Sequence, residues 1–108
     1  MDYKEMCDLV ESLGWKYRTT RANRAIYNIG PFRLVEHNCS WSIAKDDDLY
    51  YIEDVDENII REYTDIVTKI VCDVRNSGSI SECLADISRL DKFYEKYNDY
   101  YPEEEFFD

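Results

Sequence analysis

The stretch DDDLYYIEDVDENIIREYTDIVTKIVCDVRN, residues 46–76, decides the organisation of this chain. Its first part carries seven acidic residues with no lysine or arginine among them. Apolar residues then recur at the spacing of one helix face, namely Ile59, Ile60, Tyr63, Ile66, Val67, Ile70, Val71 and Val74. We therefore predict an acidic turn followed by a long helix over 56–76, with Asp54 or Asp56 as its N-cap.

Charged residues on this helix alternate in sign at i, i+4, in the series Glu57, Arg61, Asp65, Lys69 and Asp73. Such a ladder neutralises itself, so we interpret the helix as scaffold. Ser79 with Glu82 can cap a second helix over 79–101, which ends before Pro102. Its apolar stripe is expected to face the core and comprises Ile80, Cys83, Leu84, Ile87, Leu90, Tyr94 and Tyr97. The short connection predicts an antiparallel helical hairpin.

The first half of the chain begins with a helix and then changes to a period of two. Asp2 with Glu5 forms a capping box for a helix over 3–13, and Gly14 ends it. In the first strand, Trp15, Tyr17 and Thr19 should alternate with the solvent-facing Lys16, Arg18 and Thr20. Further strands are predicted over 25–29, 32–36, 40–44 and 49–52, and their short connections favour antiparallel pairing.

The predicted fold is a single α+β domain over 1–108. It has an N-terminal helix (1–14), an antiparallel meander of four or five strands (15–52), and a helical hairpin (56–76 and 79–101) packed on one sheet face. An acidic, aromatic tail (102–108) follows. A chain of 108 residues with 44% apolar content can build one core, and no apolar run is long enough for a membrane span. Without a signal-like segment, we expect a cytoplasmic protein.

Cysteine spacing and motif content point away from metal binding and catalysis. Cys7, Cys39, Cys72 and Cys83 form no CxxC pair, so free thiols are expected. His37 could pair with Cys39 only across a tight turn, and no known catalytic or phosphate-binding motif occurs. The acidic turn lacks the spacing and the glycine of a calcium loop. We expect no enzyme activity, no cofactor and no metal site.

The net charge of −11 is unevenly distributed along the chain. Residues 1–44 sum to +1, whereas residues 45–108 sum to −12. Most of the surface should repel nucleic acid and anionic membranes and attract basic proteins, although acidity can also serve solubility alone. A basic cluster around the first hairpins, formed by Lys16, Arg18, Arg21, Arg24 and Arg33 with Tyr17, Tyr27 and Phe32, matches a single-strand binding platform. The overall charge opposes that use.

Acidic residues of the last helix repeat the same sign at i, i+4, in the order Asp91, Glu95 and Asp99, and Glu103, Glu104 and Glu105 continue them. Lys92 and Lys96 relieve this repulsion only in part. The aromatics among these acids are Tyr94, Tyr97, Tyr100, Tyr101, Phe106 and Phe107, too many to face the core together. Aromatic residues are common interface anchors, so the pattern favours docking into a basic groove; a solvated helix and tail is the alternative.

Three segments carry this pattern: Asp46-Asp47-Asp48, residues 53–57 and residues 97–108. In style they resemble the small acidic proteins with which phages block defence systems, the anti-CRISPR and anti-restriction DNA mimics. The resemblance implies a non-enzymatic inhibitor, in the host cytoplasm, that fills the nucleic-acid groove of a Cas effector or restriction enzyme. The basic first half departs from a pure mimic.

On this hypothesis carboxylates replace phosphates and aromatics anchor the complex. The expected partner-binding residues are Asp46, Asp47, Asp48, Glu53, Asp54, Asp91, Glu95, Asp99, Glu103, Glu104 and Glu105, with Tyr97, Tyr100, Tyr101 and Phe106 as anchors. An immunity protein against a basic nuclease toxin would use the same surface. An accessory protein that binds nucleic acid through the Lys16–Arg33 face is the alternative from another class.

Overall fold

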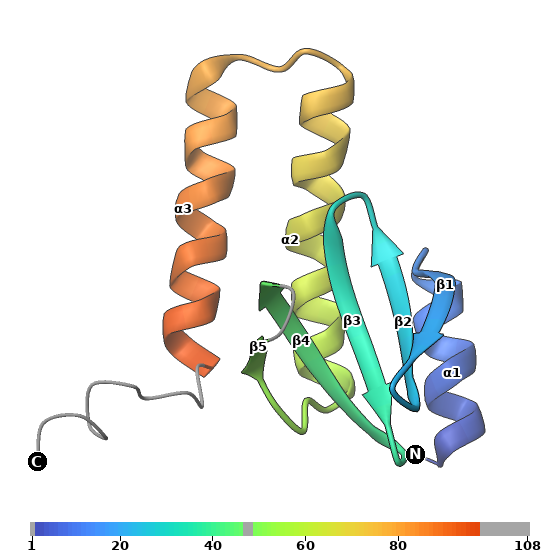
Figure 1. Cartoon of the computed structure of the whole chain (residues 1–108). Helices are drawn as coiled ribbons and strands as arrows, with labels where there is room; N and C mark the ends of the chain where they lie inside the picture. The colour runs from blue at the N-terminus through green and yellow to red at the C-terminus, as the bar shows by residue number, and fades with distance from the viewer. Residues whose placement is uncertain (1, 47–48, 98–108) are drawn as a thin grey trace, which may run out of the picture.

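The computed structural model describes residues 2–46 and 49–97 (Figure 1). Its elements are α1 (Tyr3–Ser12), β1 (Lys16–Arg21), β2 (Arg24–Ile29), β3 (Phe32–His37), β4 (Ser40–Asp46), β5 (Leu49–Ile52), α2 (Glu57–Arg75) and α3 (Ile80–Tyr97). The fold is α+β, as predicted, with one helix before the strands and two after them. The part of the predicted last helix beyond Tyr97 lies outside the described residues.

The strands form one antiparallel sheet in the order β1-β2-β3-β4-β5, which confirms the predicted meander. Tyr27 pairs with Leu34, Leu34 with Ile43, and Ile43 with Ile52, so these buried side chains form one row across the sheet. Because side chains alternate along a strand, this row defines the face that carries the core.

One detail of the first strand differs from the predicted alternation. A β-bulge lies between Tyr17 and Thr19, and beyond it Thr19 pairs with Ile26 and Thr20 with Ala25. An extra residue in one strand reverses the faces that follow it. Thr20 therefore lies on the side of Tyr17, whose hydroxyl is 2.6 Å from the Thr20 hydroxyl. The prediction that placed Thr19 with Tyr17 was wrong at this point.

Helices α1 and α2 cover the core face of the sheet. Val10 of α1 and Ile60 and Tyr63 of α2 are fully buried in the same cluster as the sheet residues. Trp15, just after α1, stacks on Tyr63 with ring centroids 5.7 Å apart. The opposite side chains of the sheet do not join this cluster, and in Figure 1 the strands pass in front of α2.

Each helix begins at a side-chain cap that the sequence predicted. The Asp2 carboxylate accepts a hydrogen bond from the Glu5 amide at 2.8 Å, and the Glu5 carboxylate accepts one from the Asp2 amide at 2.9 Å. Asp56, rather than Asp54, caps α2 by accepting from the Ile59 amide. Ser79 accepts from the Glu82 amide at the start of α3. These bonds satisfy backbone donors that a helix start leaves open.

The α2–α3 hairpin extends beyond the end of the sheet (Figure 1). Val71 of α2 packs against the β2–β3 turn, where a Cβ on Gly30 would lie only 2.7 Å from the Val71 side chain. Val74, one turn further along α2, is 66% exposed. The prediction that the apolar stripe of α3 faces the core is wrong for the first half of this helix, where Ile80, Leu84 and Ile87 are 80%, 61% and 49% exposed. The described part of the sheet does not reach them.

Candidate functional site

The acidic turn and the loop after β5 were the first predicted binding region. Asp47 and Asp48 lie outside the described residues, and Asp46 ends β4. Glu53 and Asp54 are exposed. Asp54 has a positive φ of 54° and its carboxylate accepts a hydrogen bond from the Ser40 hydroxyl. The loop is thus tied to the start of β4, with Glu53 facing solvent.

The acids of α2 are used within the fold. Glu57 pairs with Arg61 at 3.1 Å and Asp73 with Lys69 at 2.8 Å, as the predicted ladder requires. Asp65 pairs instead with Arg89 of α3 at 3.0 Å. The ladder is therefore partly a link between the two helices. The interpretation of α2 as scaffold agrees with these pairs.

Asp86 of α3 lies beside the Lys69–Asp73 pair in the hairpin. Its side chain is buried, with Oδ1 3.9 Å from Lys69 Nζ. Hydrogen bonding to the Asp73 carboxyl, together with burial, raises the pKa of Asp86. Lys69 donates to Asp73 and lowers the pKa of that carboxyl. Lys69 therefore contacts two carboxyl groups, that of Asp73, whose pKa is lowered, and that of Asp86, whose pKa is raised. These contacts join α3 to α2.

Asp91 and Glu95 behave differently from these paired acids. Both are exposed, and within residues 2–46 and 49–97 neither takes part in a salt bridge or hydrogen bond. Their spacing of four places them on one face of α3, about 6 Å apart along its axis. We call these two residues the α3 acid row. These are the predicted binding acids that lie on a described helix, and neither of them has a partner among the described residues.

Tyr97, a predicted anchor, is largely engaged inside the fold. Its ring packs on Phe93 with centroids 5.0 Å apart, and its hydroxyl donates to Glu62 at 2.7 Å. Lys96 Nζ lies 4.8 Å from the ring centre. Tyr97 is half-buried, so only part of its ring could meet a partner. The other predicted residues of this region, Asp99, Tyr100, Tyr101, Glu103, Glu104, Glu105 and Phe106, lie outside the described residues.

The basic residues of the first strands gather on the sheet face that no described helix covers, which we call the uncovered sheet face. Strand register places Lys16 beside Asn28, Arg21 beside Arg24, and Asn28 beside Arg33. All of them are on the face opposite the Tyr27 row. Arg18 lies at the bulge and has no register partner in β2, so strand pairing does not assign its side chain to this face. Arg24 and Arg33 are half-buried, whereas Lys16 and Arg21 are exposed.

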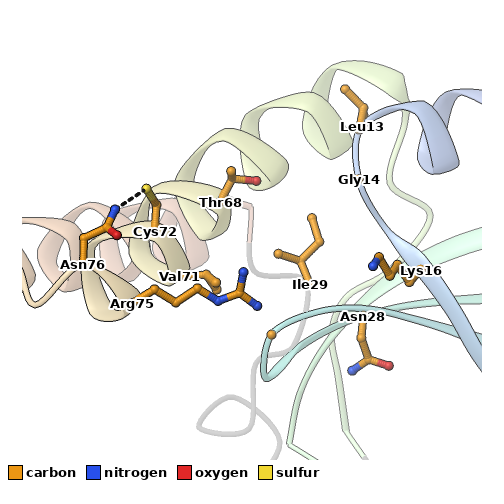
Figure 2. A pocket seen from close by; sticks show the side chains of 11 residues that line it. Leu13, Gly14, Lys16, Asn28, Ile29, Thr68, Val71, Cys72, Arg75 and Asn76 are labelled. Atoms are coloured by element: carbon orange, nitrogen blue, oxygen red, sulfur yellow. Dashed lines mark hydrogen bonds between the residues drawn. The ribbon is translucent and has the colours of Figure 1, made fainter.

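A shallow pocket of about 520 Å³ lies between the start of β1, the β2–β3 turn and the last turns of α2 (Figure 2). Lys16 and Arg75 line it from opposite sides, with Asn28, Thr68 and Asn76 as polar neighbours. Cys72 accepts a hydrogen bond from the Asn76 amide group at 3.3 Å. Among the described lining residues there is no carboxylate and no histidine, and the two cationic side chains favour an anionic group over a cationic one.

Elsewhere the described residues offer little for catalysis. His37 is half-buried and makes no hydrogen bond with Cys39, whose amide donates instead to Glu36 at 2.9 Å. All four cysteines are free thiols. In residues 2–46 and 49–97 no group of three or more acidic, histidine or cysteine side chains is arranged to hold a metal ion. No helix in this part of the chain has the length and apolar character of a membrane span.

Sequence reasoning missed one surface feature, the exposed aliphatic residues at the end of the hairpin. Their helical spacing was visible, but the pattern does not show how far the sheet extends beneath a helix.

Comparison with family models, with curated protein sequences and with solved structures finds no match to this chain.

Proposed function

We propose that this chain is a non-enzymatic inhibitory binding protein. Its partner is a basic protein that handles nucleic acid, such as a Cas effector or a restriction enzyme, and the inhibitor occupies the groove that holds the nucleic acid. The observation that carries the proposal is the α3 acid row. Asp91 and Glu95 stay exposed and unpaired among the described residues, while the acids of α2 are neutralised by Arg61, Lys69 and Arg89.

Charge explains why such a surface suits a phosphate-binding groove. Lysine and arginine that contact phosphates also form charge-assisted hydrogen bonds with carboxylates. The net charge of −11 speeds the encounter with a basic surface. Like charges at i, i+4 cost a helix a few tenths of a kcal/mol, so the α3 acid row does not help the free protein to fold.

The remaining parts of the proposed surface stay predictions. They are the acidic turn at Asp46–Asp48 and the tail residues Asp99, Tyr100, Tyr101, Glu103–Glu105 and Phe106. Tyr97 contributes the edge of a ring that already packs on Phe93. The anchor role therefore passes to the tail aromatics, which supply large contact area at low entropic cost. An immunity protein against a basic nuclease toxin is the same proposal with a different target.

The test uses purified guide-loaded Cas effectors and restriction enzymes, and measures both their binding to this protein and their binding to duplex DNA. For a true target, Asp91→Asn with Glu95→Gln should weaken the complex about tenfold and restore DNA binding. The matched control is Glu57→Gln with Asp65→Asn, which removes the same charge from paired acids. Affinity should fall steeply as salt rises.

Two results would count against the proposal. One is a complex whose affinity is flat across a salt series and unchanged by either pair of substitutions. The other is equal weakening by both pairs, because net charge rather than the α3 acid row would then explain the binding.

A second candidate function rests on the uncovered sheet face. Lys16, Arg21, Arg24 and Arg33 are brought to it in register, next to the cationic pocket lined by Lys16 and Arg75. This arrangement favours an accessory protein that binds single-stranded nucleic acid. An electrophoretic shift with single-stranded DNA or RNA at moderate salt, abolished by Lys16→Ala with Arg21→Ala, would support it. If no shift is seen, the second candidate is rejected and the inhibitor remains as the proposed function.

A further inference from the structure

The end of the α2–α3 hairpin, residues 69–90, carries an apolar surface that the fold does not cover. We call this segment the hairpin tip. Val74, Ile80, Leu84 and Ile87 are between 49% and 80% exposed, and Cys83 and Leu90 beside them are half-buried. The residues Ile80, Leu84 and Ile87 follow a spacing of four and three, so they form a continuous row along α3.

A single exposed leucine on a protein surface is ordinary, but several large aliphatics at one end of the molecule form a patch. The rest of the described surface shows only two other large exposed apolar residues, Tyr3 and Tyr17. Both tyrosines have polar partners, because their hydroxyls contact Glu36 and Thr20. The hairpin tip has no such explanation within the fold.

The charge of the hairpin tip indicates what covers it. Residues 69–90 contain three basic residues (Lys69, Arg75, Arg89) and three acidic ones (Asp73, Glu82, Asp86), so the segment is neutral in a chain of net charge −11. Four of these six side chains are paired in the hairpin through Lys69 and Arg89. A basic partner would find no complementary field at this end of the molecule.

Neutrality also disfavours the chain's own tail as the cover. Residues 98–108 carry five acidic residues and no basic one, so the tail gains no attraction from the hairpin tip. Two whole copies of the protein repel each other over most of their surface, since residues 45–108 sum to −12. Asp91 follows Ile87 by one turn on the same face, so two copies approach through the hairpin tip with the least repulsion when their α3 helices run antiparallel, which keeps the two Asp91 carboxylates apart.

We propose that the hairpin tip is the interface of a symmetric dimer, in which the row of Ile80, Leu84 and Ile87 packs against the same row of a second copy. A two-fold axis brings identical patches together, so an apolar and neutral patch is complementary to itself. The exposed row spans about 12 Å of helix, which makes a contact smaller than the roughly 800 Å² a side of a standard stable interface. A contact of this size is typical of weak, transient complexes, so the dimer should form only at high protein concentration.

Sedimentation velocity of the full chain over a wide concentration range tests the proposal. The wild type should pass from monomer to dimer, and salt should leave the dissociation constant unchanged or lower it, because screening reduces repulsion between the copies. Leu84→Glu should raise the dissociation constant at least tenfold, since it places two like charges in a desolvated contact. Ala85→Glu is the matched control, with the same new charge on an exposed residue about 100° around the helix.

A second variant guards against loss of folding as the cause. Ile80→Glu puts an acid in the first turn of α3, where the helix dipole favours it, so the monomer should remain folded by circular dichroism while the dimer dissociates. A wild type that stays monomeric at every concentration would overturn the proposal, whether the tail or another protein covers the hairpin tip. So would a dimer that survives both variants. The inhibitor proposal is tested by the opposite salt response and by different residues, so the two can fail separately.

Discussion

At the scale of single residues, Thr64 joins the N-terminal segment to the long helix. Its hydroxyl accepts a hydrogen bond from the Trp15 indole at 2.8 Å and donates one to the Ile60 carbonyl at 2.6 Å. Trp15 is 2% exposed, so no solvent reaches the indole N–H if this partner is lost. A buried donor without an acceptor pays its full desolvation cost.

Thr64→Val should therefore destabilise the protein by about 1–3 kcal/mol, although it keeps the shape of the side chain. Urea unfolding followed by tryptophan fluorescence measures the change in unfolding free energy. Thr68→Val, at an exposed position one turn further along α2, is the control and should change it by less than about 0.5 kcal/mol. Equal effects of the two substitutions would show that Trp15 does not depend on Thr64.

Tyr27 links stability to alkaline pH. Burial, with smaller contributions from Cys7 and Glu11, raises the pKa of Tyr27 from 10.0 to about 12. The folded state holds this proton more tightly than the unfolded state, so the stabilising contribution is complete below pH 10 and is lost as the pH rises towards 12. The unfolding free energy should fall by on the order of 2 kcal/mol over this interval through Tyr27 alone.

Denaturant unfolding at a series of pH values, with Tyr27→Phe as the comparison, isolates that contribution. The variant should lose less stability than the wild type between pH 10 and pH 12, because its side chain has no proton to release. Tyr63, whose pKa burial also raises, still titrates in both proteins. Parallel pH profiles would contradict the assignment to Tyr27.

At the scale of elements, the β2–β3 turn sets how closely the sheet approaches α2. Gly30 has a φ of 57°, a conformation that L residues rarely adopt, and its Cα faces Val71. Gly30→Ala should destabilise the protein by about 1–3 kcal/mol, through backbone strain and a clash at 2.7 Å. Thermal unfolding checks this.

The double variant Gly30→Ala with Val71→Ala separates the two causes of that loss. It removes the clash but keeps the strain of a positive φ, so the cost of the glycine substitution should be smaller in the Val71→Ala background than in the wild type. An additive result would mean that the contact with Val71 contributes nothing.

The elements show why the sequence predicted some features and not others. The predicted apolar stripe of α2 is buried from Ile60 to Val67 because the sheet packs against that part of the helix. The caps at Asp2, Asp56 and Ser79 were predictable because a helix cap depends on residues only three positions apart. The same apolar spacing failed in α3 at Ile80 and Leu84. Periodicity shows that residues share a face, but the extent of the neighbouring layer decides whether that face is buried. Likewise, no local signal announced the bulge after Tyr17.

At the scale of the whole molecule, charge and apolar surface are separated along α3. Its first half presents Ile80, Leu84 and Ile87, and its second half presents the α3 acid row. The sequence predicted the acid row from like charges at i, i+4, but it could not show which other acids are paired, because the Asp65–Arg89 pair joins two helices. One helix thus carries both proposed contact regions, which meet where Asp91 follows Ile87 by one turn; substitutions at Ile80 or Leu84, further from the acids, should leave Glu95 unaffected.

A last prediction follows from the cost of the α3 acid row to the free protein. Asp91 and Glu95 repel each other and add to a half-chain of charge −12, so the neutral variant Asp91→Asn with Glu95→Gln should stabilise the free protein by a few tenths of a kcal/mol at low salt. The gain should shrink as salt screens the charges. Asp65→Lys, which breaks the pair with Arg89, should instead lower stability. Denaturant unfolding at low and high salt measures these differences. If the inhibitor proposal is correct, this more stable double variant should also bind a basic target about tenfold more weakly, because the two acids then serve binding rather than folding. A double variant that is less stable than the wild type would show that Asp91 and Glu95 support the fold, and would remove the observation on which that proposal rests.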